Sequence, residues 1–296
     1  MPRSLDVFAW LLAATATLAA ASATAQESST QAAEATEPST PRESLPLWEI
    51  GLVGIAAYQP AYPGSDQNLA RGRILPFGIY RGSVLHMDGG GIGLRAFRTP
   101  RFEWDVSGSA AFGSSANRVR ARAGMPSIGT LVEIGPAVTI NLGDLVDPRR
   151  EMRLTRLDIP VRAVFDVNDR FSHKGWTFEP RLSHTAWTGR SASLVVSASA
   201  LFGNRSLNAL YYGVDAPYAT VDRPAYGASA GLVATRLNAS LRHRINSTLR
   251  VQYFAQLETV RGAANEASPL VRSRQDGGFG VSLIWGFWHS DATGTE

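Results

Sequence analysis

The sequence predicts an all-β fold, a transmembrane antiparallel β-barrel of about twelve strands, with ten as the fallback. Apolar and polar residues alternate with a period of two over segments of about 10–14 residues. Strands of soluble proteins average about 5–6 residues, whereas strands that cross a bilayer need about 9–11. The apolar faces carry Trp, Tyr and Phe near their ends, as the aromatic girdles of membrane barrels do. The polar faces carry charges of both signs, which suit a wet barrel interior better than the core of a secreted β-sandwich.

The first 25 residues are expected to be a signal peptide and not part of the fold. Arg3 precedes the apolar run 7–20, and the small-residue sequence ATA (23–25) predicts cleavage directly after it. A run of about 14 apolar residues is too short to cross a bilayer as a helix, which needs about 20. An uncleaved N-terminal anchor is the alternative. Residues 26–47 are rich in Ser, Thr, Glu, Pro and Ala, and we expect a disordered periplasmic linker there.

Eleven segments are predicted to form the strands of a barrel that covers residues 48–288. In strand 102–113, for example, the apolar residues Phe102 and Trp104 alternate with acidic ones. Single-chain bacterial barrels have even strand counts, so one strand is missing from this set or one is superfluous. Weak candidates for a missing strand are 115–123 and 206–214. A polar tail, 289–296, follows the barrel. The eleven predicted strands are 48–58, 73–81, 84–98, 102–113, 131–142, 152–167, 175–188, 192–203, 225–238, 247–260 and 278–288.

Composition and motifs argue against several classes of function. The chain has no cysteine, and its five histidines lack metal-ligand spacing, so neither a metal site nor a cofactor is expected. The net charge of +4 comes without a dense basic tract, so nucleic acid is not an expected partner. GASAG (227–231) matches a nucleophile elbow, but Ser229 falls in a predicted strand with no helix after it, so no catalytic residue is assigned. DGGGIGL (88–94) lacks the helix and the lysine of a phosphate-binding loop.

Charged residues on the polar strand faces are the strongest physical signal, and they are expected to point into the lumen. The structural interpretation is a salt-bridge network that fills a narrow lumen. The functional interpretation is a selective pore lined by fixed charge. The predicted lumen charge network consists of Glu103, Asp105, Glu133, Arg156, Asp158, Arg162, Asp166, Glu179, Arg181, Arg250 and Glu258.

Six short motifs occur in a regular order across the predicted barrel: AYPGS (61–65), LPFGIYRG (75–82), RAGMP (122–126), EIGP (133–136), YYGV (211–214) and ASPLV (267–271). In order and spacing they resemble the MipA/OmpV family of outer-membrane barrels. The resemblance implies a protein of the outer membrane without catalytic machinery. It also implies a scaffold that brings a lytic transglycosylase, which is a murein hydrolase, together with a murein synthase. These two enzymes and outer-membrane lipid are the implied partners.

Three functions remain open from the sequence: a scaffold for murein enzymes, a small-solute channel, and a surface adhesin that acts through its longer loops. The scaffold depends on the resemblance alone, because the residues themselves indicate only a barrel. The resemblance supplies no established functional residues to transfer. One departure is that outer-membrane barrels commonly end on a C-terminal aromatic residue, whereas a polar tail follows Trp288 here.

Overall fold

A computed structural model describes residues 46–81, 85–88, 91–94, 97–99, 101–142, 153–187 and 191–292. The predicted signal peptide, nearly all of the predicted linker and the last four residues of the predicted tail lie outside these described residues. Within the described part of the chain, no helix has both the length and the apolar character needed to cross a membrane.

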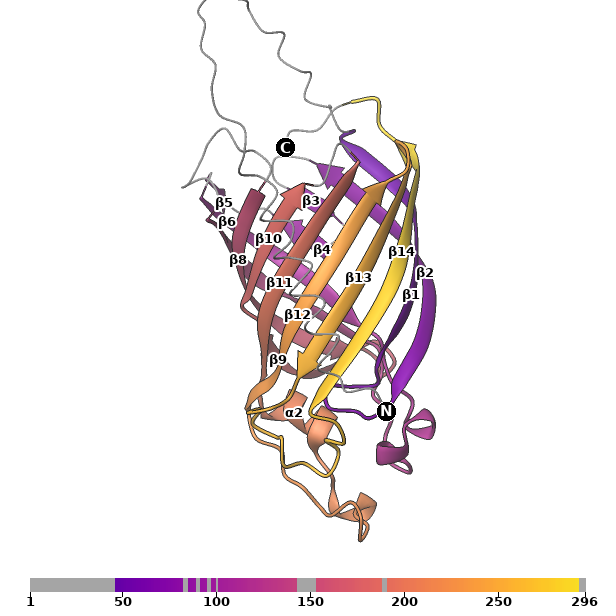
Figure 1. Ribbon diagram of the computed structural model, residues 1–296, viewed down its shortest axis with the longest axis vertical. Coiled ribbons are helices and arrows are strands. Elements are labelled where there is room, and N and C mark those ends of the chain that lie inside the picture. Colours follow the sequence, from indigo (N-terminus) through magenta and orange to yellow (C-terminus); the bar gives the residue numbers. More distant parts are fainter. Residues whose placement is uncertain are drawn as a thin grey trace, which may run out of the picture. The chain divides into compact units, whose positions relative to one another are not determined.

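The described strands form one antiparallel sheet of fourteen members, which curves into a barrel (Figure 1). β1 and β14 pair with each other, so the first and last strands are neighbours. β4 lies beside β6, so the two ends of the strand path also lie close together. The predicted all-β barrel class is confirmed. The strands are β1 (Trp48–Pro60), β2 (Asn68–Arg81), β3 (Leu85–Asp88), β4 (Gly91–Leu94), β5 (Phe97–Arg98), β6 (Phe102–Ala111), β7 (Leu131–Asn141), β8 (Arg153–Asp166), β9 (Ser172–Phe178), β10 (Arg181–Trp187), β11 (Ala192–Gly203), β12 (Gly231–Arg244), β13 (Leu249–Thr259) and β14 (Gln275–His289).

The fourteen strands occupy twelve places around the sheet. β9 and β10 share one place, because both pair with β8 on one side and β11 on the other. β4 and β5 are consecutive in the chain and both lie beside β6, so they share another. The strand missing from the prediction lies within 84–98, where β3 and β4 pair with each other and one strand was expected. Asp88 pairs with Gly91, and the two residues between them are glycines, which two-residue hairpins prefer.

Neither weak candidate for an extra strand is a strand. Residues 115–123 contain two short 3-10 helices, η2 (Ala116–Arg118) and η3 (Arg120–Arg122), and 206–214 falls largely in α2 (Arg205–Tyr212). The helix α2 begins where it does because the side chain of Asn204 accepts a hydrogen bond from the backbone N–H of Leu207. The predicted strand 225–238 is also displaced, since β12 runs from Gly231 to Arg244.

The outer face of the barrel is apolar, with aromatic residues near both of its ends. On β14 the side chains of Phe279 and Trp285 are 63% and 49% exposed, whereas Ser282 between them is buried. At one end of β1, Trp48 packs edge-on against Trp288 with the ring centroids 5.7 Å apart. At the other end, Tyr58 lies 5.8 Å from Phe279. Aromatic residues at two levels are typical of the two interfaces of a membrane.

The two ends of the barrel differ in the length of their connections. At one end, here called the loop end, the chain makes its three longest connections, 112–130, 204–230 and 260–274. At the opposite turn end lie the connection 245–248 and both ends of the described chain, where the backbone N–H of Leu47 donates to the carbonyl of Ala292. Periplasmic turns of outer-membrane barrels are short and extracellular loops are long, so we expect the loop end to face the cell exterior.

Candidate functional site: the charged lumen and its cap

Arg236 on β12 is the centre of a buried charge cluster in the lumen. Its Nε donates to Glu258 Oε2 at 2.7 Å, and its Nη1 lies 3.4 Å from Glu179 Oε1. Glu179, which lies between β9 and β10, also accepts a hydrogen bond from Arg181 Nη2 at 3.1 Å and one from Ser199 Oγ at 2.9 Å. Glu179 and Glu258 are both 6% exposed. Buried carboxylates are tolerated when they are paired in this way, so the cluster holds its charges without bulk water.

A second cluster lies on the neighbouring strands β6, β7, β8 and β9. Glu133 Oε2 is 3.7 Å from Arg162 Nη1, and it accepts a hydrogen bond from Thr177 Oγ1 at 3.2 Å. The Nε of Arg162 donates to Ser107 Oγ at 2.9 Å. These residues come from four successive places around the sheet, so the cluster ties one wall of the barrel together across its inner face.

The structure distributes the rest of the predicted network over the inner wall. Arg250 pairs with Glu49 near the turn end, where Gly286 leaves the room that the carboxylate of Glu49 fills. Asp158 accepts a hydrogen bond from Thr139 Oγ1 at 2.8 Å, and Asp166 accepts one from the backbone N–H of Asn168 at 2.9 Å. The remaining three residues of the predicted network are half-buried or exposed: Glu103 and Asp105 on β6 and Arg156 on β8.

Two charged residues that the sequence prediction omitted belong to this interior. Arg236 joins two predicted carboxylates, and Glu49 is the partner of Arg250. Arg236 was not included in the predicted network, although the predicted strand 225–238 contains it. The alternation of Arg236, Asn238 and Ser240 with apolar residues on β12 is the signal that marks this face.

The loop end of the lumen is covered by a cap, formed by the connections 61–67, 112–130, 204–230 and 260–274. The cap has its own hydrophobic core, in which Leu207 and Leu270 are 1% and 0% exposed. Hydrogen bonds join connections that are far apart in the chain. Tyr62 Oη donates to the carbonyl of Leu270 at 2.7 Å, and Ser268 Oγ donates to the carbonyl of Tyr212 at 2.7 Å. The cap is therefore a packed layer built from several connections, and not a set of independent loops.

Two arginines of the cap bind backbone carbonyls in place of carboxylates. Arg122, which is 3% exposed, donates to the carbonyls of Leu210, Tyr211 and Pro126 at 3.1–3.2 Å. The loss of hydration on burial lowers the pKa of Arg122 from its ordinary value. Each guanidinium holds a whole connection in place, because several carbonyls converge on it. The second arginine, Arg223, donates to carbonyls of Tyr218, Ala121 and Ala123.

Burial also raises the pKa values of the tyrosines of the cap. It raises the pKa of Tyr62 to about 12, although the nearby guanidinium of Arg122 opposes part of this shift. Burial likewise raises the pKa values of Tyr211 and Tyr212 above the ordinary value. These phenols stay neutral over the physiological pH range, so the cap can hold them in an apolar environment.

A cavity of about 260 Å³ separates the cap from the charge clusters. Its walls include Glu133, Glu179 and Arg236 on the barrel side, and Tyr62 and Leu207 on the cap side. A space of this size can hold water or one small solute.

The chemistry of the described residues does not point to a reaction. No group of three or more His, Asp or Glu side chains among them is arranged to hold a metal ion. Ser229 of the GASAG sequence was expected within a strand, but it lies in the connection before β12. Its backbone N–H donates to Asn265 Oδ1 at 2.8 Å, so this segment serves to hold the cap together. His184 lies on the wall, where its Nδ1 is 2.9 Å from Thr155 Oγ1.

Comparison with known proteins adds a family and a set of distant folds. A family model described as "MltA-interacting protein MipA" matches residues 52–287. No protein in the curated set matches the chain. A solved bacterial polysaccharide outer membrane secretin is 7% identical, with 81% of this chain and 99% of that chain covered and a TM-score of 0.38. The NanC porin is 8% identical over 80% and 100% of the two chains, with a TM-score of 0.30. A FadL homologue from Pseudomonas aeruginosa is 10% identical over 73% and 60%, also with a TM-score of 0.30.

Proposed function

The chain belongs to the MltA-interacting protein MipA family, and from that membership we propose that it is a non-enzymatic outer-membrane scaffold for murein-synthesising and murein-hydrolysing enzymes. The match extends over residues 52–287, which include nearly the whole barrel, and it is the observation that carries the proposal. The family name refers to an interaction with MltA. By the resemblance described above, the partner enzymes are a lytic transglycosylase and a murein synthase.

The position of murein determines which surface of the barrel serves as the scaffold. Murein and its enzymes lie in the periplasm, on the side of the turn end. The binding surface proposed here therefore consists of the short turns together with residues 26–47, taken as a periplasmic linker after removal of residues 1–25. A disordered segment suits this task, because it can fold on binding and reach more than one partner. The strand β14 ends with His289 at the same end of the barrel.

Two features of the interior favour the scaffold over a channel. The cap covers the loop end with a hydrophobic core, and the cavity beneath it measures only about 260 Å³. The lumen charges are matched in pairs, such as Arg236 with Glu258 and Arg162 with Glu133. Paired charges attract each other across the bore, whereas a conducting pore needs charges that remain accessible to passing ions.

A retention experiment on the full mature chain tests the proposal. The protein, immobilised in detergent, is expected to retain a purified lytic transglycosylase and a purified murein synthase. Removal of residues 26–47 should weaken the retention of at least one enzyme. A matched control replaces Val221, a fully exposed residue of the cap, by Ser, and it should retain both enzymes because it alters the opposite end. If the full chain retains neither enzyme, the scaffold proposal fails.

A further inference from the structure

Within the described part of the chain, one edge of β2 has no neighbouring strand over most of its length. β1 pairs with β2 from Asn68 to Tyr80, but β3 pairs with it only at Tyr80 and Arg81. Among the described residues, the opposite edge from Asn68 to Ile79 has no strand beside it. The connection 112–130 crosses over from the end of β6 and reaches β2 only at its start. There Arg120 donates its backbone N–H to Gln67 Oε1 at 2.6 Å.

The pairing pattern shows which backbone groups face this open edge. The backbone N–H of Ala61 donates to the carbonyl of Gln67, so Gln67 directs its backbone groups toward β1. Hydrogen-bonded pairs recur at every second residue of an antiparallel ladder, so the odd-numbered residues of β2 do the same. The even-numbered residues of β2 therefore direct their N–H and C=O groups away from β1. Pro76 occupies one of these positions, where the missing N–H of proline costs no ladder bond. The carbonyl of Gly72 occupies another, and it accepts a hydrogen bond from Arg73 Nη1 at 2.9 Å.

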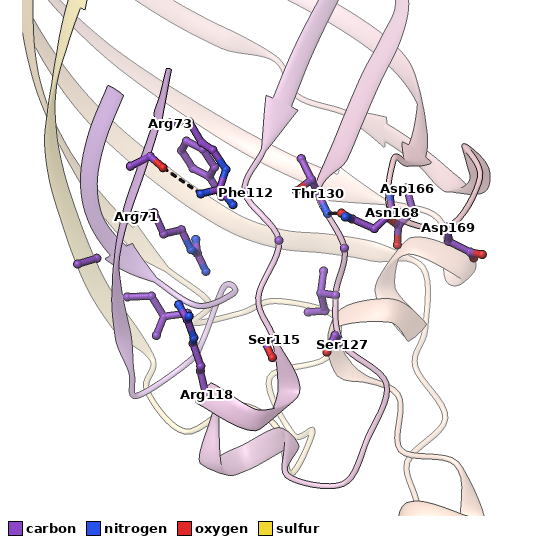
Figure 2. Close-up of a pocket in the computed structure, with 16 residues that line it drawn as sticks. Arg71, Arg73, Phe112, Ser115, Arg118, Ser127, Thr130, Asp166, Asn168 and Asp169 are labelled. Atoms are coloured by element: carbon purple, nitrogen blue, oxygen red, sulfur yellow. Dashed lines mark hydrogen bonds between the residues drawn. The ribbon is translucent and has the colours of Figure 1, made fainter. Parts of the chain in front are cut away.

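A pocket of about 590 Å³, here called the edge pocket, lies between the open edge and the end of β6 (Figure 2). Residues Leu69–Arg73 of β2 form one wall, and the connection 112–130 supplies the facing wall with Phe112, Arg118 and Thr130. Asp166 and Asp169 stand at the far side. An unpaired backbone N–H or C=O group beside hydrocarbon costs several kcal/mol. In a membrane, polar groups of another molecule must therefore hydrogen-bond to the open edge of β2.

The edge pocket carries positive charge that the described residues do not neutralise. Arg71, Arg73 and Arg118 line it, and none of the three makes an ion pair within the described part of the chain. Of the two acids at the far side, Asp169 is paired with Lys174 at 2.7 Å. Among the described residues, Asp166 accepts only the backbone N–H of Asn168, so one carboxylate stands against three guanidinium groups. The arginine side is thus left to attract an anion, and guanidinium groups bind phosphate particularly well.

The depth of the edge pocket matches the headgroups of the outer leaflet. β2 has 14 residues. At about 3.3 Å per residue and a tilt of about 40° it rises roughly 35 Å, more than the apolar band of about 25 Å. Leu69–Arg73 directly follow Asn68, the first residue of β2 at the loop end, and so lie near the outer interface. The next residue toward the membrane centre is apolar and faces outward, since Ile74 is 74% exposed.

We propose that the edge pocket binds the phosphorylated saccharide headgroup of an outer-leaflet lipid. The phosphate pairs with Arg71, Arg73 and Arg118, and the sugar hydroxyls satisfy the open backbone groups of β2. The acyl chains descend along Ile74, on the outer face of β2. The bound lipid thereby completes the wall of the barrel where the strands do not. This site faces the exterior and is independent of the scaffold role, which uses the turn end.

Lipid binding to the full mature chain in detergent tests the proposal by native mass spectrometry and thermal unfolding. The probes are bis-phosphorylated lipid A, its dephosphorylated form and inorganic phosphate. The wild type should bind the phosphorylated lipid about tenfold or more tightly than the dephosphorylated lipid, as expected when charge-assisted hydrogen bonds are lost. The triple variant Arg71→Gln, Arg73→Gln, Arg118→Gln should lose this preference. The control Arg261→Gln, an exposed arginine of the cap outside the edge pocket, should keep it.

Unheated and boiled samples of each variant are compared on a detergent gel, where a folded membrane barrel is expected to shift on boiling, so loss of binding is not confused with loss of the barrel. Equal binding of the phosphorylated and dephosphorylated lipids overturns the proposal. An unchanged preference in the folded triple variant overturns it as well. If inorganic phosphate stabilises the protein at the same concentration as the phosphorylated lipid, the site recognises free phosphate and the assignment to a lipid fails.

Discussion

At the scale of single residues, the interior of this barrel depends on a few charges that are buried together. Arg236 is shared by Glu179 and Glu258, both of which are almost fully buried. A buried ion pair contributes little net stability compared with apolar residues of the same shape, because both partners lose their hydration. Removal of one partner is nevertheless costly, since the other charge remains buried without compensation.

We therefore expect Arg236→Ala to lower the free energy of unfolding by about 3–5 kcal/mol. The control Arg261→Ala removes an exposed arginine and should change the free energy of unfolding by less than about 0.5 kcal/mol. Urea unfolding in lipid vesicles, followed by tryptophan fluorescence, measures both. The double variant Arg236→Ala, Glu258→Gln should recover part of the loss, because the two residues are coupled. A loss below about 1 kcal/mol would mean that water already solvates these carboxylates.

The buried phenol of Tyr62 predicts a loss of stability at alkaline pH. Its folded-state pKa of about 12 lies above the ordinary value of 10.0, so the folded protein holds this proton more tightly than the unfolded chain. The resulting stability is fully present below about pH 10 and is lost as the pH rises through 12. Tyr62→Phe should cost about 0.5–1.5 kcal/mol at pH 7, through the lost bond to Leu270. It should also reduce the alkaline slope.

Melting temperatures between pH 8 and pH 12 provide the measurement for Tyr62→Phe. The pKa values of Tyr211 and Tyr212 are also raised. The decrease of the melting temperature with rising pH should therefore become shallower in Tyr62→Phe without disappearing. Tyr253→Phe, on the exposed outer face of β13, is the control and should leave the slope unchanged. Identical slopes for the wild type and Tyr62→Phe would show that this phenol does not govern the alkaline transition.

At the scale of strands, the two faces of each segment lie in different solvents. On β8, Val161 is 41% exposed on the outer face, whereas the neighbouring Arg162 points inward and pairs with Glu133. A shift of the register by one residue would exchange these faces and place charges in lipid. Alternation is therefore the most reliable signal for long strands. Alternation is a weaker signal for the segment 84–98, because the pattern of two short paired strands resembles that of one long strand.

Substitutions on the two faces of β8 should have opposite consequences. Ile159 is next to the middle of the strand, and Ile159→Arg should cost about 2–4 kcal/mol if it lies at the midplane of the membrane. Asp158→Asn alters the inner face and should cost less, because the amide oxygen can still accept the hydrogen bond of Thr139. Denaturant titrations of both variants in lipid vesicles compare them. If Asp158→Asn is far the more damaging, the register assigned to β8 is wrong.

At the scale of the whole molecule, the barrel has one covered end and one end made of short turns. The cap joins connections that are far apart in the chain, through contacts such as that between Tyr62 and Leu270. This arrangement separates the exterior from the lumen. It also leaves the turn end as the surface nearest to murein, which is where the proposed scaffold function needs it.

Replacement of residues 207–226 by a short Gly-Ser turn should open the loop end. In planar bilayers we expect little or no conductance from the wild type and clear steps from this cap variant, because a wet lumen without its cover conducts ions. Val221→Ser leaves the cap core intact and should behave like the wild type. Stable, large steps from the wild type would contradict a covered lumen and favour the small-solute channel.

The sequence by itself determined the all-β class, most strand positions and which strand faces point inward. These features depend on local alternation and on the length needed to cross a bilayer, and both can be read from neighbouring residues. The residues of the predicted charge network were chosen in this way, because residues such as Glu133 and Arg162 alternate with apolar ones in their own strands.

Only the tertiary structure decided which charges meet, how the loop end is covered and where a strand edge stays open. Arg236 joins Glu179 and Glu258 from three separate places around the sheet. Arg71 and Arg118 share a pocket because a connection from β6 folds beside β2. Such contacts depend on the curvature and register of the sheet and on the packing of long connections, which bring together residues far apart in the chain and leave no periodic signal in it.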